Sequence, residues 1–398
     1  MLDRLRDVLR DFFRKGDMVL LALCLIASLF GLLLIYSATR SSVYYKPALL
    51  SCASKQAMFL CMGLVLYLIF TMVDIELILE KSWKFLVLAG VVLLLMLIPF
   101  GVEGDTGNRS WMYLPGVPFG LQPAELVKVP FILVMARILD KNREHGLSRP
   151  SSVLLLVGYT LFFAGLIAVL SKDYGMVLVY ILLFVVMAWS AGMNKRWFAL
   201  GGALAAAAIG AVAFLANTSE TFMNKFGYII RRFTEAYTRS DPQGTGWQQT
   251  RSILAIGSGQ LTGQGYLQGN LTQSIYESSL PARHTDEIFA VCGEEFGLIG
   301  CLVVLLLLCA IFLRCLWVAK ASRSPLSAYI AAGFAGMLLI QTVINVAMCL
   351  YLFPVVGLTL PFFSYGGSSI LTLYICMGIV SGIKMRFLPN WLRDRSNL

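Results

Sequence analysis

The chain has 398 residues, of which 58% are hydrophobic and only 14% are charged, and its mean hydropathy is +0.76. A water-soluble domain carries about 25% charged residues, so this composition excludes a soluble globular protein. The formal net charge of +10 does not indicate nucleic-acid binding, because the basic residues follow a pattern typical of membrane topology.

Apolar segments recur along the chain, and each approaches or exceeds the roughly 20 residues that a helix needs to cross hydrocarbon. The sequence predicts an all-α polytopic membrane protein with about ten transmembrane helices. A membrane domain is expected over 18–388, between cytoplasmic tails at 1–17 and 389–398, with a large extracytoplasmic loop at 217–287 between helices 7 and 8. The predicted spans are 18–38, 52–73, 82–100, 123–139, 151–171, 174–192, 197–216, 288–316, 328–352 and 369–387.

The basic residues set the predicted orientation. With the N-terminus inside, the cytoplasmic segments contain 20 of the 32 Lys and Arg residues, although the longest loop lies outside. This asymmetry is the positive-inside rule, and an even number of spans returns the C-terminus to the cytoplasm. The run from Met18 to Ala38 is too long for a signal peptide and is predicted to be an uncleaved first helix.

Two features mark the long outer loop. Residues 222–237 place apolar side chains at helical spacing, which predicts an amphipathic helix in the outer interface or a solvated helix on the bundle. A group of glycines follows, and these are expected to let the backbone re-enter the protein and approach a ligand closely. They are Gly257, Gly259, Gly263, Gly265 and Gly269.

An ionisable side chain at mid-bilayer costs about 2.5–3.5 kcal/mol on insertion scales, so each one within a span needs a reason. At the outer start of the fourth helix, Glu125 and Lys128 are three residues apart and therefore share one face. They can form a structural ion pair or line a ligand cavity. On the preceding outer loop, Arg109 and Trp111 can anchor at the interface or meet a phosphate.

A second polar cluster directly precedes the eighth helix and contains His284 and Asp286. Asp286 is expected at the mouth of the bundle, where it can act as a base or cap the helix. His284 is one of only two histidines, and the nine cysteines form no CxxC pair, so no metal site is predicted. The cysteines are expected to be packing residues.

Two more clusters lie near the C-terminus. Gln341 and Asn345 are four residues apart on the ninth helix and suit hydrogen bonding between helices. Segment 354–369 is rich in Pro, Gly and Ser, and non-helical backbone at membrane depth survives only inside protein or beside a wet cavity. Its candidate site residues are Ser364, Gly366 and Gly367. Together the four clusters fit group transfer from a lipid-linked phosphate donor without a soluble cofactor.

These segments resemble the SEDS family of peptidoglycan glycosyltransferases (RodA, FtsW and SpoVE) over nearly the whole chain. Segment 265–273 and the short termini are more similar to RodA than to FtsW. Four motifs occur in the family's order: Arg109-Ser-Trp111 with Gln122-Pro-x-Glu125-x-x-Lys128; Gln249-x-x-Ser252 with Ala255-Ile-Gly-Ser-Gly259; Leu280-Pro-x-x-His284-Thr-Asp286; and Asn345 through Ser369, with Ser364-Tyr-Gly366-Gly367.

The resemblance implies polymerisation of lipid II on the outer face of the bacterial cytoplasmic (inner) membrane, with release of undecaprenyl pyrophosphate. Asp286 matches the family's essential aspartate and is the expected base that activates the acceptor hydroxyl. Lys128 and Arg109 are expected to stabilise the pyrophosphate. The other motif residues are expected to bind substrate: Glu125, Trp111, Gln249, Ser252, His284, Asn345, Ser364, Gly366 and Gly367.

The resemblance also implies a class B penicillin-binding transpeptidase as partner, within the elongation or division machinery, and a RodA-like role in cell shape. The sequence leaves open whether a divalent cation (Mg or Mn) assists. It also leaves open a lipid II flippase or a non-catalytic scaffold for the transpeptidase. The chain departs from the family pattern at several positions. The family's Gln-Pro-Asp-x-Gly reads Ser171-Lys172-Asp173-Tyr174-Gly175 here, and Glu287 replaces an aromatic and could share the base role.

Overall fold

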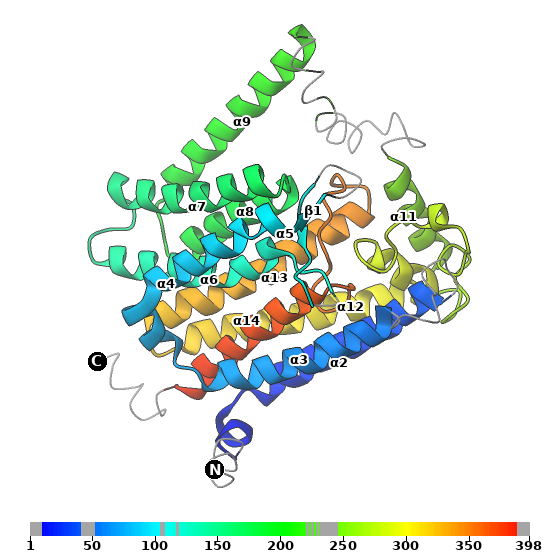
Figure 1. The fold of residues 1–398 in the computed structure, drawn as a ribbon, viewed down its shortest axis with the longest axis horizontal. Helices are drawn as coiled ribbons and strands as arrows, with labels where there is room; N and C mark the ends of the chain where they lie inside the picture. Colours follow the sequence, from blue (N-terminus) through cyan, green and yellow to red (C-terminus); the bar gives the residue numbers. More distant parts are fainter. Residues whose placement is uncertain are drawn as a thin grey trace.

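The computed structural model describes residues 10–40, 52–103, 108–116, 119–219 and 246–387, with isolated positions 223, 227 and 230. Figure 1 shows these residues as an α-helical bundle. The amphipathic helix predicted over 222–237 lies outside the described ranges. The elements are α2 (Met18–Arg40), α3 (Cys52–Met72), α4 (Ile75–Leu95), α5 (Leu97–Phe100), β1 (Gly101–Val102), β2 (Trp111–Met112), α6 (Pro123–Arg143), α7 (Pro150–Leu170), α8 (Tyr174–Ser190), α9 (Lys195–Thr218), α11 (Trp247–Ser258), η1 (Glu277–Ser279), α12 (Ile288–Ala321), α13 (Pro325–Cys349) and α14 (Gly367–Met385).

Ten helices of 17 residues or more lie in the described ranges, and each overlaps a predicted apolar span, although α4 begins at Ile75 and ends at Leu95 whereas the prediction was 82–100. Eight of them are long and apolar enough to cross a membrane. Of the other two, α6 contains six charged residues and α8 is only 17 residues long. The predicted all-α polytopic membrane fold is therefore confirmed, while the number of crossings stays a prediction.

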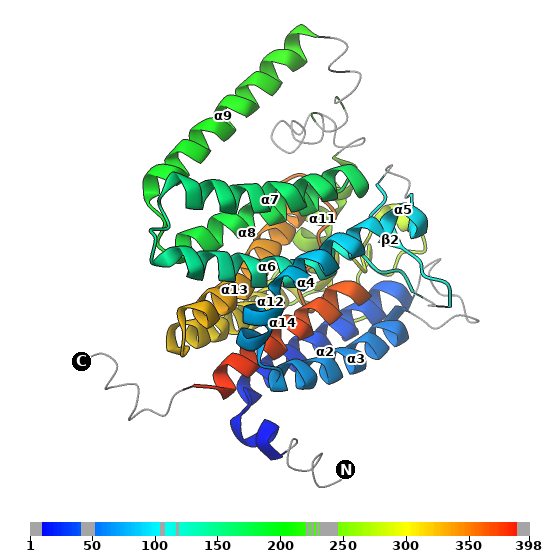
Figure 2. The ribbon, with the colours of Figure 1, turned by 60° about the vertical axis from the view of Figure 1, so that its left-hand side comes forward.

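The helices differ in how much of their surface the bundle covers. Most residues of α13 and α14 are buried, which places these two helices inside the bundle. In contrast, α9 has no buried residue and extends away from the other helices (Figures 1 and 2). A helix that is apolar on every face is stable when lipid surrounds it, because lipid tails are as apolar as a protein core.

Small residues allow α3 and α14 to pack closely. A Cβ atom at Gly378 would lie 2.7 Å from the carbonyl oxygen of Tyr67, and one at Gly63 would lie 2.9 Å from the ring of Tyr374. Close approach of small residues is the usual way in which membrane helices gain dispersion contacts. The α3–α14 pair therefore packs closely next to the segment that precedes α14.

The long helix α12 was predicted as one continuous span but is broken at Gly297, which has φ 63° and ψ −160°. The break leaves backbone groups on either side without helical partners, and in a membrane protein these must be satisfied internally. The outer-loop backbone supplies the partners. Four hydrogen bonds do this: Leu298 N to Gln260 O (2.9 Å), Ile299 N to Leu261 O (3.1 Å), Gln264 N to Glu294 O (2.9 Å) and Gly265 N to Glu295 O (3.1 Å).

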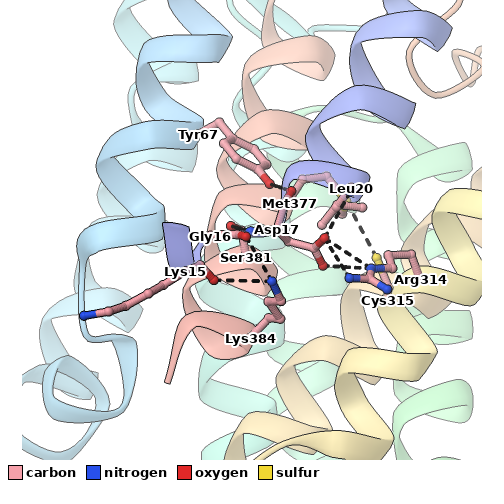
Figure 3. A network of polar contacts seen from close by, with 10 residues as sticks. All are labelled: Lys15, Gly16, Asp17, Leu20, Tyr67, Arg314, Cys315, Met377, Ser381 and Lys384. Carbon is pink, nitrogen blue, oxygen red and sulfur yellow. Dashed lines mark hydrogen bonds and ion pairs between the residues drawn. The ribbon is translucent and has the colours of Figure 1, made fainter. Parts of the chain in front are cut away.

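A buried ion pair joins α2 to α12 at one end of the bundle, here called the Asp17 end (Figure 3). The Asp17 carboxylate is fully buried and accepts hydrogen bonds from two nitrogens of the Arg314 guanidinium, the shortest being Nε–Oδ2 at 2.9 Å and Nη2–Oδ1 at 3.0 Å. The backbone of Asp17 is held by two more hydrogen bonds: Asp17 N donates to Ser381 Oγ, and Tyr67 OH donates to Asp17 O. This cluster therefore ties together α2, α3, α12 and α14.

Replacing Arg314 with Met should leave the Asp17 carboxylate buried without its partner and cost about 3–5 kcal/mol of stability. The combined Asp17→Asn and Arg314→Met variant should lose clearly less. Lys15→Met is the matched control, because the Lys15–Asp11 pair is half exposed and such pairs contribute about 0–1 kcal/mol. Denaturant unfolding in detergent measures all three. Equal losses for Arg314→Met and Lys15→Met would contradict the assignment.

Candidate active site

Two side-chain amides on α13 hold the site together. Asn345 is fully buried, and its Nδ2 donates to the backbone carbonyls of Asp286 (2.8 Å) and Leu358 (2.7 Å). One turn earlier, Gln341 Nε2 lies 3.4 Å from Glu125 Oε1. Four helical residues span about 6 Å, so the Asp286 segment and the start of α6 contact adjacent turns of α13. We call this region the Asp286 end of the bundle.

Glu125 and Lys128 form a buried ion pair on the first turns of α6. Lys128 Nζ lies 2.6 Å from Glu125 Oε2, and the Lys128 side chain is fully enclosed. Pro123 occupies the first helical turn, where its missing N–H costs nothing. The sequence left open an ion pair or a cavity lining, and the structure shows the ion pair. The ammonium charge of Lys128 is therefore neutralised by its neighbour within the protein.

Asp173 connects three segments at the same end. Its Oδ1 caps α8 by accepting from Met176 N (3.0 Å), and its Oδ2 accepts from Ser110 Oγ (3.0 Å) and Gln122 Nε2 (3.2 Å). Burial raises the pKa of Asp173, and the charge of Glu125 raises it further, while these hydrogen bonds oppose the shift. Asp173 was not among the expected site residues. The N-cap position before an apolar helix was the sequence signal that could have identified it.

Asp286 lies just before α12 and is partly exposed. A Cβ atom on Gly357 would lie 3.8 Å from its Oδ2, so the carboxylate faces the segment between α13 and α14. Desolvation, followed by the charges of Glu287 and Asp173, raises the pKa of Asp286 from its ordinary value to about 7. Such a carboxylate can accept a proton near neutral pH. The electrostatic links from Asp286 to Asp173 and from Asp173 to Glu125 place three carboxylates in one region.

Glu287 faces a different environment from its neighbour Asp286. Its carboxylate is fully buried against α11, where Oε1 accepts from Gln248 Nε2 at 3.3 Å. Burial raises the pKa of Glu287, and the hydrogen bond from Gln248 opposes the shift. The two adjacent carboxylates therefore do not converge on one point, and a shared base role finds no support in this geometry.

The predicted binding residues Gln249 and Ser252 dock α11 on the end of α13. Gln249 Nε2 donates to the carbonyls of Met348 (3.1 Å) and Phe353 (2.6 Å), and Ser252 Oγ donates to that of Cys349 (2.9 Å). Both side chains are buried. In the structure they position backbone, and their expected contact with substrate stays a prediction.

The segment before α14 is fastened to the segment before α12. Ser364 Oγ donates to Thr285 O (2.6 Å), and Tyr365 N donates to His284 O (2.9 Å). The His284 ring lies 5.7 Å from the Tyr365 ring. Two glycines follow in close contact: Gly366 N donates to Gln56 Oε1, and a Cβ atom on Gly367 would lie 2.5 Å from the Phe59 ring. These predicted residues therefore shape the backbone beside Asp286.

Arg109 and Trp111 lie on the outer segment that forms the small β1–β2 pair. The Arg109 guanidinium donates to the carbonyls of Ile98 and Gly101, each at 3.0 Å, and its backbone N–H donates to Ser171 O. Trp111 is 41% exposed and is free to lie in an interface. Arg109 thus stabilises the end of α4–α5 in this structure, and a phosphate contact would use its remaining N–H groups.

Three glycines of the outer loop, Gly259, Gly263 and Gly269, lie against α12, and the expected approach of the loop to a ligand stays a prediction. A Cβ atom on Gly259 would lie 1.9 Å from Gly293 O, and one on Gly263 would lie 2.1 Å from Glu295 O. Glu294 fastens the same loop, because its carboxylate accepts from Leu271 N (2.7 Å) and from Thr272 N (2.8 Å). The loop is therefore an integral part of the broken α12 helix.

No group of three or more His, Cys, Asp or Glu side chains in the described part of the chain is arranged to hold a metal ion. Six of the nine cysteines are buried, in keeping with packing residues. The site therefore consists of a partly exposed carboxylate, a buried ion pair and a set of backbone segments held by amides and hydroxyls. Together, fold and site define a polytopic helical membrane protein with its reactive groups at one end of the bundle.

Comparisons with known proteins agree with this description. A family model described as "Cell cycle protein", for FtsW, RodA and SpoVE, matches residues 17–387. The chain is 32% identical over 383 residues to the probable peptidoglycan glycosyltransferase FtsW of Trichlorobacter lovleyi, covering 95% of this chain and 96% of the relative. It is 31% identical over 325 residues to the peptidoglycan glycosyltransferase MrdB of Escherichia coli, covering 81% and 83%.

A solved structure described as "Structural coordination of polymerization and crosslinking by a peptidoglycan synthase complex" has the same fold. Its TM-score is 0.74 at 26% identity, over 96% of this chain and 98% of that chain. The chain belongs to the FtsW/RodA/SpoVE family, which is the SEDS family, and it is an integral membrane protein. The family predicted from the sequence motifs is therefore confirmed.

Gly259→Ala should destabilise the protein by roughly 1–3 kcal/mol or more, because the added methyl group overlaps the Gly293 carbonyl and must push α11 from α12. Gly257→Ala is the matched control. A Cβ atom at Gly257 meets nothing within 4 Å, so this change should stabilise α11 by up to about 1 kcal/mol. Thermal unfolding in detergent measures both, and similar unfolding temperatures for the two variants would disprove the close contact.

Proposed function

We propose that this protein is a peptidoglycan glycosyltransferase that polymerises lipid II into glycan strands, with Asp286 as the general base. The enzyme class is that of its relatives, which are named peptidoglycan glycosyltransferases. The observation that carries the assignment of the base is the environment of Asp286. It is a carboxylate beside Gly357 whose surroundings raise its pKa to about 7.

The proposed reaction is an inverting displacement. The 4-hydroxyl oxygen of the acceptor GlcNAc attacks C1 of the donor MurNAc, and its proton passes to the Asp286 carboxylate. The bond between C1 and the pyrophosphate oxygen breaks, and undecaprenyl pyrophosphate leaves with the electron pair. A base with a pKa near the working pH combines a useful ionised fraction with a strong enough affinity for the proton.

The leaving pyrophosphate needs positive charge, for which we propose Lys128 with Arg109. Charge that develops in the transition state is stabilised best by groups fixed in advance in a water-poor site. Lys128 is enclosed and paired with Glu125. Gln341 of α13 contacts Glu125, and Asn345, one turn further along α13, binds the Asp286 segment. The ammonium has three N–H donors and uses one for Glu125, so direct contact with a phosphate requires the residues that enclose Lys128 to move. Glu125 holds the ammonium in place until then.

We place the Asp286 end at the outer face of the bacterial cytoplasmic membrane, with both termini in the cytoplasm. The positive-inside distribution of Lys and Arg supports this orientation. A class B penicillin-binding transpeptidase is the proposed partner, because the structural neighbour comes from a complex that coordinates polymerization and crosslinking. A role in elongation is proposed on the RodA-like segment 265–273, although the relatives compared include both FtsW and MrdB.

Purified Asp286→Asn protein should lose lipid II polymerisation by at least ~100-fold, since a positioned base contributes typically 10²–10⁴-fold. Glu287→Gln keeps the size of the side chain and an oxygen that can accept from Gln248, so this variant should retain most activity. The measurement uses labelled lipid II in detergent, with and without the transpeptidase, and separates glycan strands on gels. Full activity of Asp286→Asn together with inactive Glu287→Gln would reverse the assignment.

The same assay separates the rival functions. Lipid II translocation in vesicles without strand formation would identify a flippase, and neither activity would identify a scaffold. The structure favours surface chemistry over transport, because Asp17 and Arg314 form a buried, paired cluster at the opposite end of the bundle. The charges of Asp17 and Arg314 compensate each other, so neither extends a polar path from the Asp286 end.

The pH dependence follows from the raised pKa of Asp286. The ionised base is present above about pH 7, so kcat/KM should fall about tenfold per pH unit below this value and level off above it. Glu287→Gln removes a charge that raises the pKa of Asp286, so its profile should shift to lower pH. Rates across pH 5 to 9 measure both, and a profile that is flat through pH 7 would contradict Asp286 as base.

A further inference from the structure

A groove that the proposed reaction does not use lies between α4, α6 and α7. Its volume is about 420 Å³, and its walls come from the middle of α4, the last turns of α6 and residues 154–162 of α7. Figure 2 shows these three helices side by side. The α6 residues in the groove are 12 to 17 positions beyond Glu125, or roughly 18–26 Å along the helix, so the groove lies away from the Asp286 end.

The groove has an apolar part and a basic part. Val87, Leu154, Leu155 and Phe162 form much of the apolar wall, while Arg137 and Lys141 are its charged residues. No carboxylate lines it within the described part of the chain. The Arg137 guanidinium lies 5.8 Å from the centre of the Trp83 ring, and an interfacial tryptophan is typical of the headgroup level of a membrane.

One further detail indicates that a ligand fits here. Gly158 leaves the floor of the groove open, because a Cβ atom built on it meets nothing within 4 Å.

We propose that this groove binds one anionic phospholipid of the surrounding leaflet, with the phosphate at Arg137 and Lys141 and an acyl chain along Gly158 and Phe162. Charge complementarity selects this occupant over a helix of a partner protein, because basic pockets between membrane helices suit anionic head groups. An apolar wall that continues from the basic residues suits the attached chain. The site is separate from the proposed chemistry and does not depend on it.

The test uses the purified full-length protein and native mass spectrometry with phosphatidylglycerol or phosphatidylcholine as the probe. Wild-type protein should retain phosphatidylglycerol in preference. The double variant Arg137→Gln, Lys141→Gln should weaken that binding roughly 25-fold, from about fivefold for each basic residue near an anionic lipid. Its matched control is Lys81→Gln with Lys320→Gln, two exposed lysines outside the groove, which should leave the binding unchanged.

A steric pair tests the acyl-chain contact. Gly158→Leu should fill the groove and abolish lipid retention, while Gly165→Leu should not, because Gly165 lies two turns further along α7 and outside the groove. A Cβ atom at either position meets nothing within 4 Å, so both variants should fold, as thermal unfolding checks. Equal retention of the two lipids by wild-type protein, or equal losses in a variant and its control, would overturn the proposal.

Discussion

The side-chain amide of Asn345 is the contact on which the arrangement of the candidate site depends. It joins the backbone before α12 to the backbone before α14 through the carbonyls of Asp286 and Leu358. These stretches have no regular structure, so without this donor the Leu358 carbonyl would lose its amide partner and the Asp286 carbonyl would keep only the weak donor Cys349 Sγ, and an unsatisfied buried acceptor costs about 1–3 kcal/mol. One turn away, Gln341 approaches Glu125. The position of the carboxylates therefore follows from hydrogen-bond satisfaction along one face of α13.

The same constraint explains the other polar features of the bundle. Helix α12 can break at Gly297 because loop 260–265 provides donors and acceptors for the freed backbone. The Asp17 carboxylate can be buried because Arg314 binds it through two nitrogens. Lys128 can be enclosed because Glu125 is three residues away. In an environment without water, a polar group can be buried only where another part of the protein forms a hydrogen bond or an ion pair with it.

Much of the fold and part of the site could be predicted from the sequence. The apolar spans, the polar positions within them and the family motifs all indicated the helices and the two ends of the bundle. The roles of particular residues could not be predicted in the same way. Gln249 and Ser252 donate to backbone carbonyls at the end of α13, and Gly259 and Gly263 lie against α12. Residue type shows that a contact is needed but does not identify the partner.

Hydrophobicity and the spacing of charges are local properties, so the sequence by itself determined the helical class, the membrane as solvent and the residues that require partners. The distances between those residues depend on how helices far apart in the chain pack together. Only the tertiary structure therefore decided that Asp286 and Glu287 face different environments, that Asp173 joins the site, and that Arg137 and Lys141 edge an apolar groove. Each of these depends on neighbours that the local sequence does not specify.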